Sequence, residues 1–417
     1  MDLFQIIALL VIVSAACSYL NARVIKLPGT IGIISIAIVL SIITIVIDRV
    51  NPGAARYLTA LTKNINFSRT VLNVMLGFLL FAGSFNLNTQ RLKKEMRPVL
   101  ILSTVGVIFS TILFGFLFYY AASLFDIKIP LVYCFLFGAL VSPTDPVAVG
   151  GIIKGSKLPA NLETIILGES LFNDGIGLVL FITILEITES GNDHIDFAKA
   201  AVLFAREVFG GIALGTVFGF VAFRLMKSIT DFQTIVLVSI GLVMSICVVA
   251  AQFHLSIPLA VVSAGLFTGN RSINIDNKEH SHQSLEKIWM LIDEMLNTIL
   301  FVMIGLQMVN LPFLNNYWLI GGIAILMILI ARWLSIMLPL TFLRRTLNVN
   351  YGSINILTWA GLRGGISIAL ALSLPLTPYR HLILSGSYFI VIFSIIIQGL
   401  SLGKLINFSY RNKQESA

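Results

Sequence analysis

The sequence is poor in charge, in cysteine and in recognisable enzyme motifs. Charged residues make up 12% of its 417 positions, whereas hydrophobic residues make up 57%. The three cysteines, Cys17, Cys134 and Cys247, all lie inside apolar stretches, which argues against a disulfide framework. No phosphate-binding loop, nucleotide fingerprint or redox motif stands in a credible context. We therefore expect neither a soluble chain nor an enzyme, and no cofactor.

Long polar segments are also missing. The longest polar stretches have about twenty residues, and only a short tail follows Lys404. Such segments are too short to build a hydrophobic core of their own. We therefore expect residues 1–417 to form a single transmembrane domain with no appended soluble domain.

What the sequence has in abundance is apolar runs of about 17–25 residues, each long enough to cross ~30 Å of hydrocarbon. This pattern is typical of an all-α polytopic membrane protein. We predict about thirteen transmembrane helices, over residues 3–20, 30–47, 71–87, 98–121, 131–152, 161–187, 200–226, 232–252, 257–269, 291–309, 317–343, 350–374 and 383–403.

Basic residues are distributed unevenly between the predicted loops. If the N-terminus is outside, eighteen Lys and Arg residues fall in inner loops and eight in outer loops. Because short loops rich in Lys and Arg stay on the cytoplasmic side, we predict a multi-pass cell-membrane protein with the N-terminus outside and the C-terminus cytoplasmic. Two further basic residues, Arg332 and Arg363, lie within spans. For Arg332 we expect a buried charge whose partner the sequence does not identify, or a contact with a lipid phosphate.

Two polar clusters interrupt the apolar sequence near its middle, at residues 142–146 and at residues 168–175. They contain three carboxylates, Asp145, Glu169 and Asp174, with no Lys, Arg or His among the flanking apolar residues. An ionisable group at bilayer depth costs about 2.5–3.5 kcal/mol on insertion scales, so its default interpretation is functional. Oxygen ligands without soft atoms suit a small alkali cation. The two clusters therefore predict a cation site.

The predicted spans 131–152 and 350–374 are each interrupted in mid-membrane. Pro143 and Pro146 remove backbone donors from the first, and residues 361–365 concentrate glycine in the second. When the first span is set aside, the others divide into two sets of six, and each interruption falls in the fourth member of its set. Broken helices at matching positions are typical of transporters built from inverted repeats, and they point to the substrate site.

Helix geometry separates the acidic residues of the sixth span. At about 100° per residue, Asp174 shares a face with Ser170, whereas Glu169 and Asp174 diverge by roughly 140°. A carboxylate and a hydroxyl on one face can bind a hard cation, together with oxygen atoms of the unwound fifth span. The sodium ligands that we predict are Asp174, Ser170, Thr144 and Asp145.

Glu169 points away from this face and needs a cation of its own. Arg363, in the second broken helix, is the partner that we predict. A paired Glu169 stays ionised and structural. Asp174 is then the carboxylate whose charge is free to be neutralised by either an ion or a proton, so we predict that it also binds the proton.

Four segments along the chain carry a more specific pattern: Thr144-Asp145-Pro146, Glu169-Ser170 with Asn173-Asp174, residues 301–305 and residues 361–364. Together they resemble the signature of sodium/proton antiporters of the NhaP and eukaryotic NHE type, in the monovalent cation:proton antiporter family. The likeness covers essentially the whole chain in order. It implies the thirteen-helix, NhaA-like antiporter fold, a homodimer, and exchange of sodium or lithium for protons.

The resemblance also implies roles for single residues. In that family, the residue that matches Asp174 binds ion and proton alternately, and those that match Glu169 and Arg363 form a structural ion pair. Three further matching residues complete or support the ion site, namely Thr144, Asp145 and Ser170.

Two positions bear on stoichiometry and selectivity. Electrogenic relatives in the wider superfamily have an aspartate where this chain has Asn173, so a single titrating group predicts electroneutral exchange of one sodium for one proton. Several relatives have an acidic residue near Ala82, at the end of the third span, where this chain has none. Their ion selectivity is therefore not carried over.

Three alternatives stay open at the level of sequence. A potassium/proton antiporter is the nearest one, because the same carboxylates serve either ion. A cation channel is disfavoured, since channels gather identical short pore loops around an axis. An intramembrane aspartyl protease would use Asp145 and Asp174 to share a proton. It needs a Gly-x-Gly-Asp segment, and this chain has Phe172-Asn173-Asp174 instead.

Overall fold

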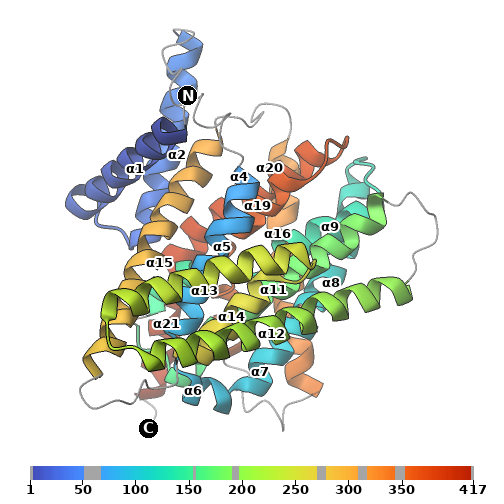
Figure 1. Ribbon diagram of the computed structural model, residues 1–417. Helices are drawn as coiled ribbons and strands as arrows, with labels where there is room; N and C mark the ends of the chain where they lie inside the picture. Colours follow the sequence, from blue (N-terminus) through green and yellow to red (C-terminus); the bar gives the residue numbers. More distant parts are fainter. Residues whose placement is uncertain are drawn as a thin grey trace.

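The protein is a bundle of helices that cross one another at several angles (Figure 1). The computed structural model describes residues 3–50, 67–153, 156–189, 197–269, 279–308, 317–342 and 353–414. Every regular element within these residues is a helix, which confirms the predicted all-α class. No membrane-crossing strand competes with this assignment in the described part of the chain.

The first half of the chain contains short π-helical turns (η) between its α-helices. Its elements are α1 (Leu3–Leu20), η1 (Asn21–Ile25), α2 (Gly29–Val50), α4 (Phe67–Thr70), η2 (Val71–Met75), α5 (Leu76–Phe85), α6 (Thr89–Lys94), α7 (Met96–Ile101), η3 (Leu102–Gly106), α8 (Val107–Leu124), α9 (Leu131–Val141) and α10 (Pro146–Ile153).

The second half begins with the longest helices. Its elements are α11 (Ala160–Glu189), α12 (Phe197–Ser228), α13 (Phe232–Gln252), α14 (Ile257–Gly269), α15 (Glu279–Gln307), α16 (Tyr317–Phe342), α18 (Ile354–Trp359), α19 (Gly365–Ser373), α20 (Arg380–Ile392), η6 (Phe393–Gln398) and α21 (Gly399–Gln414).

Eleven helical segments of the described part are long and apolar enough to cross a membrane, and they match eleven of the predicted spans. The remaining two predicted spans are made of shorter helices. The helix α14 has 13 residues, and the segment 350–374 is divided into α18 and α19. Length and composition therefore support eleven spans and do not by themselves confirm the predicted number of thirteen.

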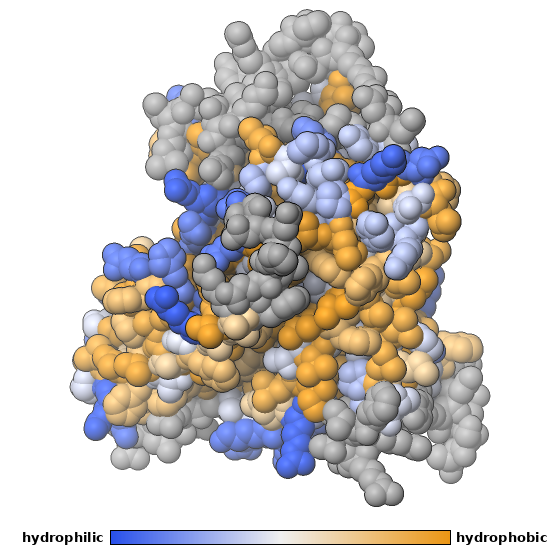
Figure 2. All heavy atoms as spheres, turned by 90° about the vertical axis from the view of Figure 1, so that its right-hand side faces the viewer, coloured by the Kyte–Doolittle hydropathy of each residue, from blue (hydrophilic) through white to orange (hydrophobic). Residues whose placement is uncertain are grey.

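The outer surface of the bundle is apolar. Figure 2 shows one side of the molecule on which hydrophobic side chains cover most of the described surface, while hydrophilic ones gather toward its edges. On α12, for example, Val202 is 69% exposed and Phe209 is 71% exposed. Such exposure is expected of a multi-pass membrane protein, because its surroundings at these depths are lipid tails.

The helix α11 lies in the interior of the bundle (Figure 1). It packs against α7, α9, α12 and α14, and its buried residues include all the polar side chains of the second cluster. A Cβ atom added to Gly177 would collide with the ring of Pro143. The absence of a side chain at this position therefore lets α11 approach the interruption between α9 and α10 closely.

Two interrupted helices meet beside α11. The helices α9 and α10 are separated by residues 142–145, and α18 and α19 by residues 360–364. The backbone N–H of Asp145 donates a hydrogen bond of 2.7 Å to the carbonyl oxygen of Leu362, so the two interruptions touch. Both predicted breaks are confirmed, and the second one lies one residue earlier than expected because Gly365 already belongs to α19.

The first interruption follows from its two prolines. Pro146 has no N–H group, so the carbonyl oxygen of Ser142 loses the donor that a continuous helix would supply four residues later. Pro146 is instead the first residue of α10, a position that proline favours. The Oδ1 atom of Asp145 accepts hydrogen bonds from the N–H groups of Val147 at 2.9 Å and Ala148 at 3.3 Å, and so caps this helix.

Candidate ion-binding site

Asp174 lies near the middle of α11, and only 1% of its surface is exposed. Its Oδ2 atom is buried and accepts no hydrogen bond within the part of the chain that the structure describes. The charges of Asp145 and Arg363 are close enough to act on it electrostatically. Because buried polar atoms are almost always paired in folded proteins, an unpaired carboxylate oxygen here indicates a position kept for an ion or a proton.

Thr144, Ser170 and Asn173 form a compact hydrogen-bonded cluster one turn away. The hydroxyl oxygens of Thr144 and Ser170 are 2.8 Å apart, and the Asn173 Nδ2 donates to Thr144 Oγ1 at 2.7 Å. The backbone N–H of Thr144 donates to Asn173 Oδ1 at 3.2 Å. Asn173 therefore uses both its donor and its acceptor to hold the first interruption against α11.

Asp145 faces the second interruption as well as its own helix. A Cβ atom at Gly364 would overlap with the Oδ2 atom of Asp145, so a glycine is needed for the two segments to approach this closely. Asp145 is half-buried, whereas Thr144 and Ser170 are almost fully buried. The structure thus brings the predicted ligands Thr144 and Ser170 into direct contact. It joins Asp174 to neither of them by a hydrogen bond.

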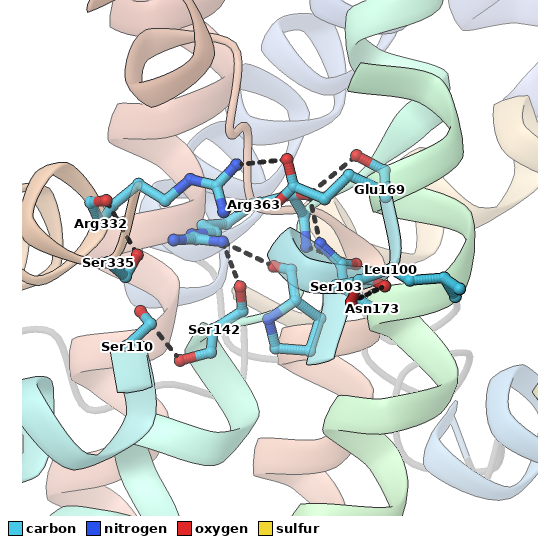
Figure 3. A network of polar contacts seen from close by, with 12 residues as sticks. Leu100, Ser103, Ser110, Ser142, Glu169, Asn173, Arg332, Ser335 and Arg363 are labelled. Carbon is cyan, nitrogen blue, oxygen red and sulfur yellow. Dashed lines mark hydrogen bonds and ion pairs between the residues drawn. The ribbon is translucent and has the colours of Figure 1, made fainter. Parts of the chain in front are cut away.

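Glu169 belongs to a different set of contacts on the same helix. Arg332 of α16 donates to both of its oxygens, from Nη1 to Oε1 at 2.5 Å and from Nη2 to Oε2 at 2.9 Å (Figure 3). The two side chains are 2% and 4% exposed. The predicted ion pair between Glu169 and Arg363 is therefore wrong, because a different arginine occupies both carboxylate oxygens.

Arg363 has another partner. Its Nη1 atom donates to the carbonyl oxygens of Ser142 and Pro143, the second at 3.0 Å (Figure 3). These carbonyls lost their helical donors, since Pro146 has no N–H and Val147 donates to Asp145. The guanidinium group of one broken helix therefore satisfies the orphan carbonyl groups of the other.

The backbone of the second interruption is also held by a side chain. The N–H of Arg363 donates to Ser394 Oγ at 2.8 Å, and this hydroxyl donates to Gln398 Oε1 at 2.7 Å. Both residues belong to η6. Sequence reasoning missed the roles of Ser394 and Arg332. Only the rarity of a basic residue inside an apolar span marked Arg332, and no sequence signal distinguished Ser394 from other serines.

No charged residue lies within the third predicted span, residues 71–87. Ala82 is fully buried in a hydrophobic cluster. Among the described residues, no group of three or more His, Cys, Asp or Glu side chains is placed to hold a metal ion. The candidate site is therefore composed of two aspartates with hydroxyl, amide and carbonyl groups, a set that suits a hard monovalent cation better than a transition metal.

Comparison with known proteins agrees with this architecture. Residues 9–407 match the family described as "Sodium/hydrogen exchanger, transmembrane". The chain is 39% identical over 416 residues to the Na(+)/H(+) antiporter NhaP of Pseudomonas aeruginosa, covering 98% of this chain and 97% of that protein. It is 32% identical over 410 residues to the Na(+)/H(+) antiporter NhaH of Halobacillus dabanensis, covering 97% of both.

The fold also resembles a solved structure. The sodium proton antiporter MjNhaP1 of Methanocaldococcus jannaschii superposes with a TM-score of 0.76 at 17% sequence identity, covering 97% of this chain and 99% of that one. This likeness confirms the predicted antiporter fold. With the family match over nearly the whole sequence, it shows that the chain belongs to the transmembrane sodium/hydrogen exchanger family.

Proposed function

We propose that the chain is a secondary active transporter that exchanges sodium or lithium for protons across the membrane, with Asp174 as the carboxylate that carries either cargo. The observation that carries this proposal is the buried Oδ2 atom of Asp174, which has no hydrogen-bond partner among the described residues. The names of the NhaP and NhaH relatives support the choice of ions. Family membership favours neither the channel nor the protease alternative.

The neighbouring oxygen atoms suit a dehydrated alkali ion. A cation that binds Asp174 meets hydroxyl oxygens of Thr144 and Ser170 nearby, which already touch each other at 2.8 Å. Asp145 adds a second carboxylate, of which Oδ1 caps α10. Oxygen ligands of this kind replace the hydration shell of a hard cation, and a proton on Asp174 neutralises the same charge.

We further propose that the exchange is electroneutral. Glu169 and Arg332 form an internally neutral pair, which leaves Asp145 and Arg363 as fixed charges around the exchanging group. If Asp174 alone alternates between proton and sodium, each cargo adds one positive charge. The two loaded states then carry the same net charge, so one sodium ion exchanges for one proton.

The contact between the two interruptions supports an alternating-access mechanism. The segments 142–145 and 360–364 are joined by the bond from Asp145 to Leu362 and by the Arg363 side chain. Within residues 143–145 and 361–364, no backbone N–H donates to the carbonyl oxygen four residues earlier. A movement of both segments as one unit past their neighbours would therefore change the side from which Asp174 is reached without breaking regular helices.

Several further assignments belong to this proposal. We infer a homodimer in the cell membrane, a single transmembrane domain over residues 1–417, and transport without a cofactor. We also infer an N-terminus outside and a C-terminus in the cytoplasm. The marked chain ends lie at opposite ends of the molecule in Figure 1, which supports termini on opposite sides of the membrane. The excess of Lys and Arg in alternate predicted loops supports the same orientation.

The decisive experiment uses purified protein in proteoliposomes that contain a pH-sensitive dye and are acidic inside. Pulses of sodium, lithium or potassium are added outside over a series of pH values. We expect proton efflux with sodium and lithium, and an apparent sodium affinity that weakens as pH falls, because protons then occupy the carboxylate. Efflux driven by potassium alone would assign the potassium/proton alternative.

The site itself is tested with Asp174→Asn. This change removes the exchanging charge and should abolish proton efflux while the protein still folds, since an amide is cheaper to bury than a carboxylate. Glu189→Gln is the matched control, because Glu189 is an exposed carboxylate near the end of the same helix. Exchange by Asp174→Asn at the wild-type rate would show that the site is wrongly assigned.

A further inference from the structure

A groove of about 910 Å³ lies between α16, α18 and α21. The short helix α18 packs against α16 and against α21, and it forms the floor between them. Most of the lining is aliphatic or aromatic, including Leu329, Trp333 and Phe408. The volume falls in the range of ligand pockets, about 300–1,000 Å³.

The groove runs from the membrane interface into the hydrocarbon. The chain leaves α16 at Phe342 and enters α18 at Ile354, so these two helix ends face the same side of the membrane. Ile330, at the deeper end of the lining, lies twelve residues before the end of α16, or about 18 Å along the helix axis. That depth is more than half of a hydrocarbon core of about 30 Å.

One part of the groove is polar and positively charged. Lys404 and Asn355 line it, and both are exposed. No salt bridge joins Lys404 to an acidic group in the described part of the chain, and no Asp or Glu belongs to the lining. The groove is therefore complementary to a molecule with an anionic head and an apolar tail.

A second polar atom lies one turn further in. Thr358 lines the groove and is 7% exposed, and its Oγ1 atom is buried, with no hydrogen-bond partner among the described residues. The neighbouring Trp359 is already satisfied, since its Nε1 donates to Ser401 Oγ at 2.8 Å. The exposed polar side chains of the lining are therefore those of Lys404 and Asn355.

We propose that this groove is a binding site for an anionic phospholipid. Its phosphate contacts Lys404 and Asn355, and one acyl chain lies along Leu329 and Trp333. Lipid is the abundant apolar material around a membrane protein at this depth. The lipid would contact α18, which leads directly into the interruption that carries Arg363.

Lipid binding in the groove can be measured through the fluorescence of native tryptophans. Trp333 and Trp359 line the groove, Trp289 is fully buried elsewhere, and Trp318 is 66% exposed on the outer part of α16. In a Trp318→Phe background, the fluorescence that lipids can reach comes from the two groove residues. The protein is reconstituted in phosphatidylcholine vesicles that contain equal mole fractions of either brominated phosphatidylglycerol or brominated phosphatidylcholine.

We expect brominated phosphatidylglycerol to quench more strongly than brominated phosphatidylcholine, with a relative affinity of about fivefold for one lysine near the surface. Lys404→Gln should remove this preference. Lys227→Gln is the matched control, an exposed lysine at the end of α12, and it should keep the preference. Equal quenching by both lipids, or an unchanged preference in Lys404→Gln, overturns the proposal, as does an equal loss in Lys227→Gln.

Native mass spectrometry provides a second measurement that does not depend on the tryptophan background. Wild-type protein in detergent is mixed with phosphatidylglycerol and phosphatidylcholine, and the retained lipid is counted. We expect preferential retention of phosphatidylglycerol by the wild type and by Lys227→Gln. Asn355→Leu and Lys404→Gln should both lose it. Equal retention by all four proteins contradicts the proposed site.

Discussion

Two carboxylates of α11, only five residues apart in sequence, have opposite hydrogen-bonding environments. Around Glu169, both oxygens are held by one guanidinium, at 2.5 and 2.9 Å. Around Asp174, one oxygen is buried with no partner in the described chain. A carboxylate that is saturated by Arg332 cannot lose its charge without leaving a buried cation unpaired. We propose that the carboxylate without such a partner alternates between a proton and a metal ion.

The two buried arginines differ in the same manner. Arg332 binds a carboxylate, whereas Arg363 binds two backbone carbonyls of the broken helix. The first arrangement cancels charge and fixes α16 against α11. The second keeps a positive charge next to Asp174 and ties the two interruptions together. One buried arginine therefore neutralises a carboxylate, and the other satisfies backbone carbonyl groups.

The largest expected effect on stability comes from breaking the saturated pair. Glu169→Gln or Arg332→Met leaves one buried charge without its partner, which typically costs about 3–5 kcal/mol. We expect a lower unfolding temperature in detergent for each single variant and partial recovery in the double variant. Glu163→Gln, on the same helix outside the cluster, is the control. Additive losses in the double variant would mean that the two side chains do not act as a pair.

Removing Arg363 should have a smaller effect on stability. Arg363→Ala leaves the carbonyl oxygens of Ser142 and Pro143 without their donor, and an unsatisfied buried group costs about 1–3 kcal/mol. Thermal unfolding measures this loss, and proteoliposome assays should also show slower exchange. Adding Glu169→Gln to this variant should lower stability further. Recovery of stability in that double variant would indicate that Glu169 pairs with Arg363, in contradiction to the contacts seen in the structure.

A change at the contact between the two interruptions should weaken transport more than stability. In Gly364→Ala, the new methyl group meets the Asp145 carboxylate, and overpacking of this kind costs about 1–3 kcal/mol. We expect slower sodium-driven proton efflux. Gly322→Ala on α16 is the matched control, because no atom lies within 4 Å of its added Cβ, and it should leave exchange unchanged. Equal rates in both variants would show that the close approach of Asp145 to residue 364 is dispensable.

The smallest expected effect is that of membrane voltage. If Asp174 alone exchanges its cargo, a potassium diffusion potential set with valinomycin supplies no driving force for the exchange. The steady-state sodium gradient in proteoliposomes should then be the same at either sign of the potential. A gradient that shifts with voltage would mean that Asp145 carries a second exchangeable proton. Asp145 would then not be a fixed charge beside Asp174.

A large part of the fold follows from the order of residue types along the chain. Apolar runs of sufficient length predict the spans, and Pro143 and Pro146 predict the first interruption because proline lacks the N–H that the helix needs. The same spacing argument places Glu169 and Asp174 on different faces of α11. The structure confirms that these two side chains have different surroundings, although it joins Ser170 to Thr144 and not to Asp174.

The partners of the charged groups depended on how the helices pack. Two arginines lie within apolar spans, and nothing in their sequence positions says which one meets Glu169. Arg332 is 163 residues away from Glu169 along the chain and reaches it only because α16 packs beside the core that holds α11. The two bonds of Asn173 to Thr144 likewise depend on the exact approach of the first interruption.

By itself, the sequence determined the membrane setting, the two interrupted helices and the set of residues from which we propose that an ion site is built. These features depend on composition, on helical periodicity and on missing backbone donors, all of which are local. The tertiary structure alone decided that Arg332 neutralises Glu169, that Arg363 satisfies the carbonyls freed by proline, and that Asp174 keeps an unpaired oxygen. Each of these outcomes is set by distances of a few ångströms between segments far apart in the chain, where a buried charge or polar group binds whichever partner the packing places within reach.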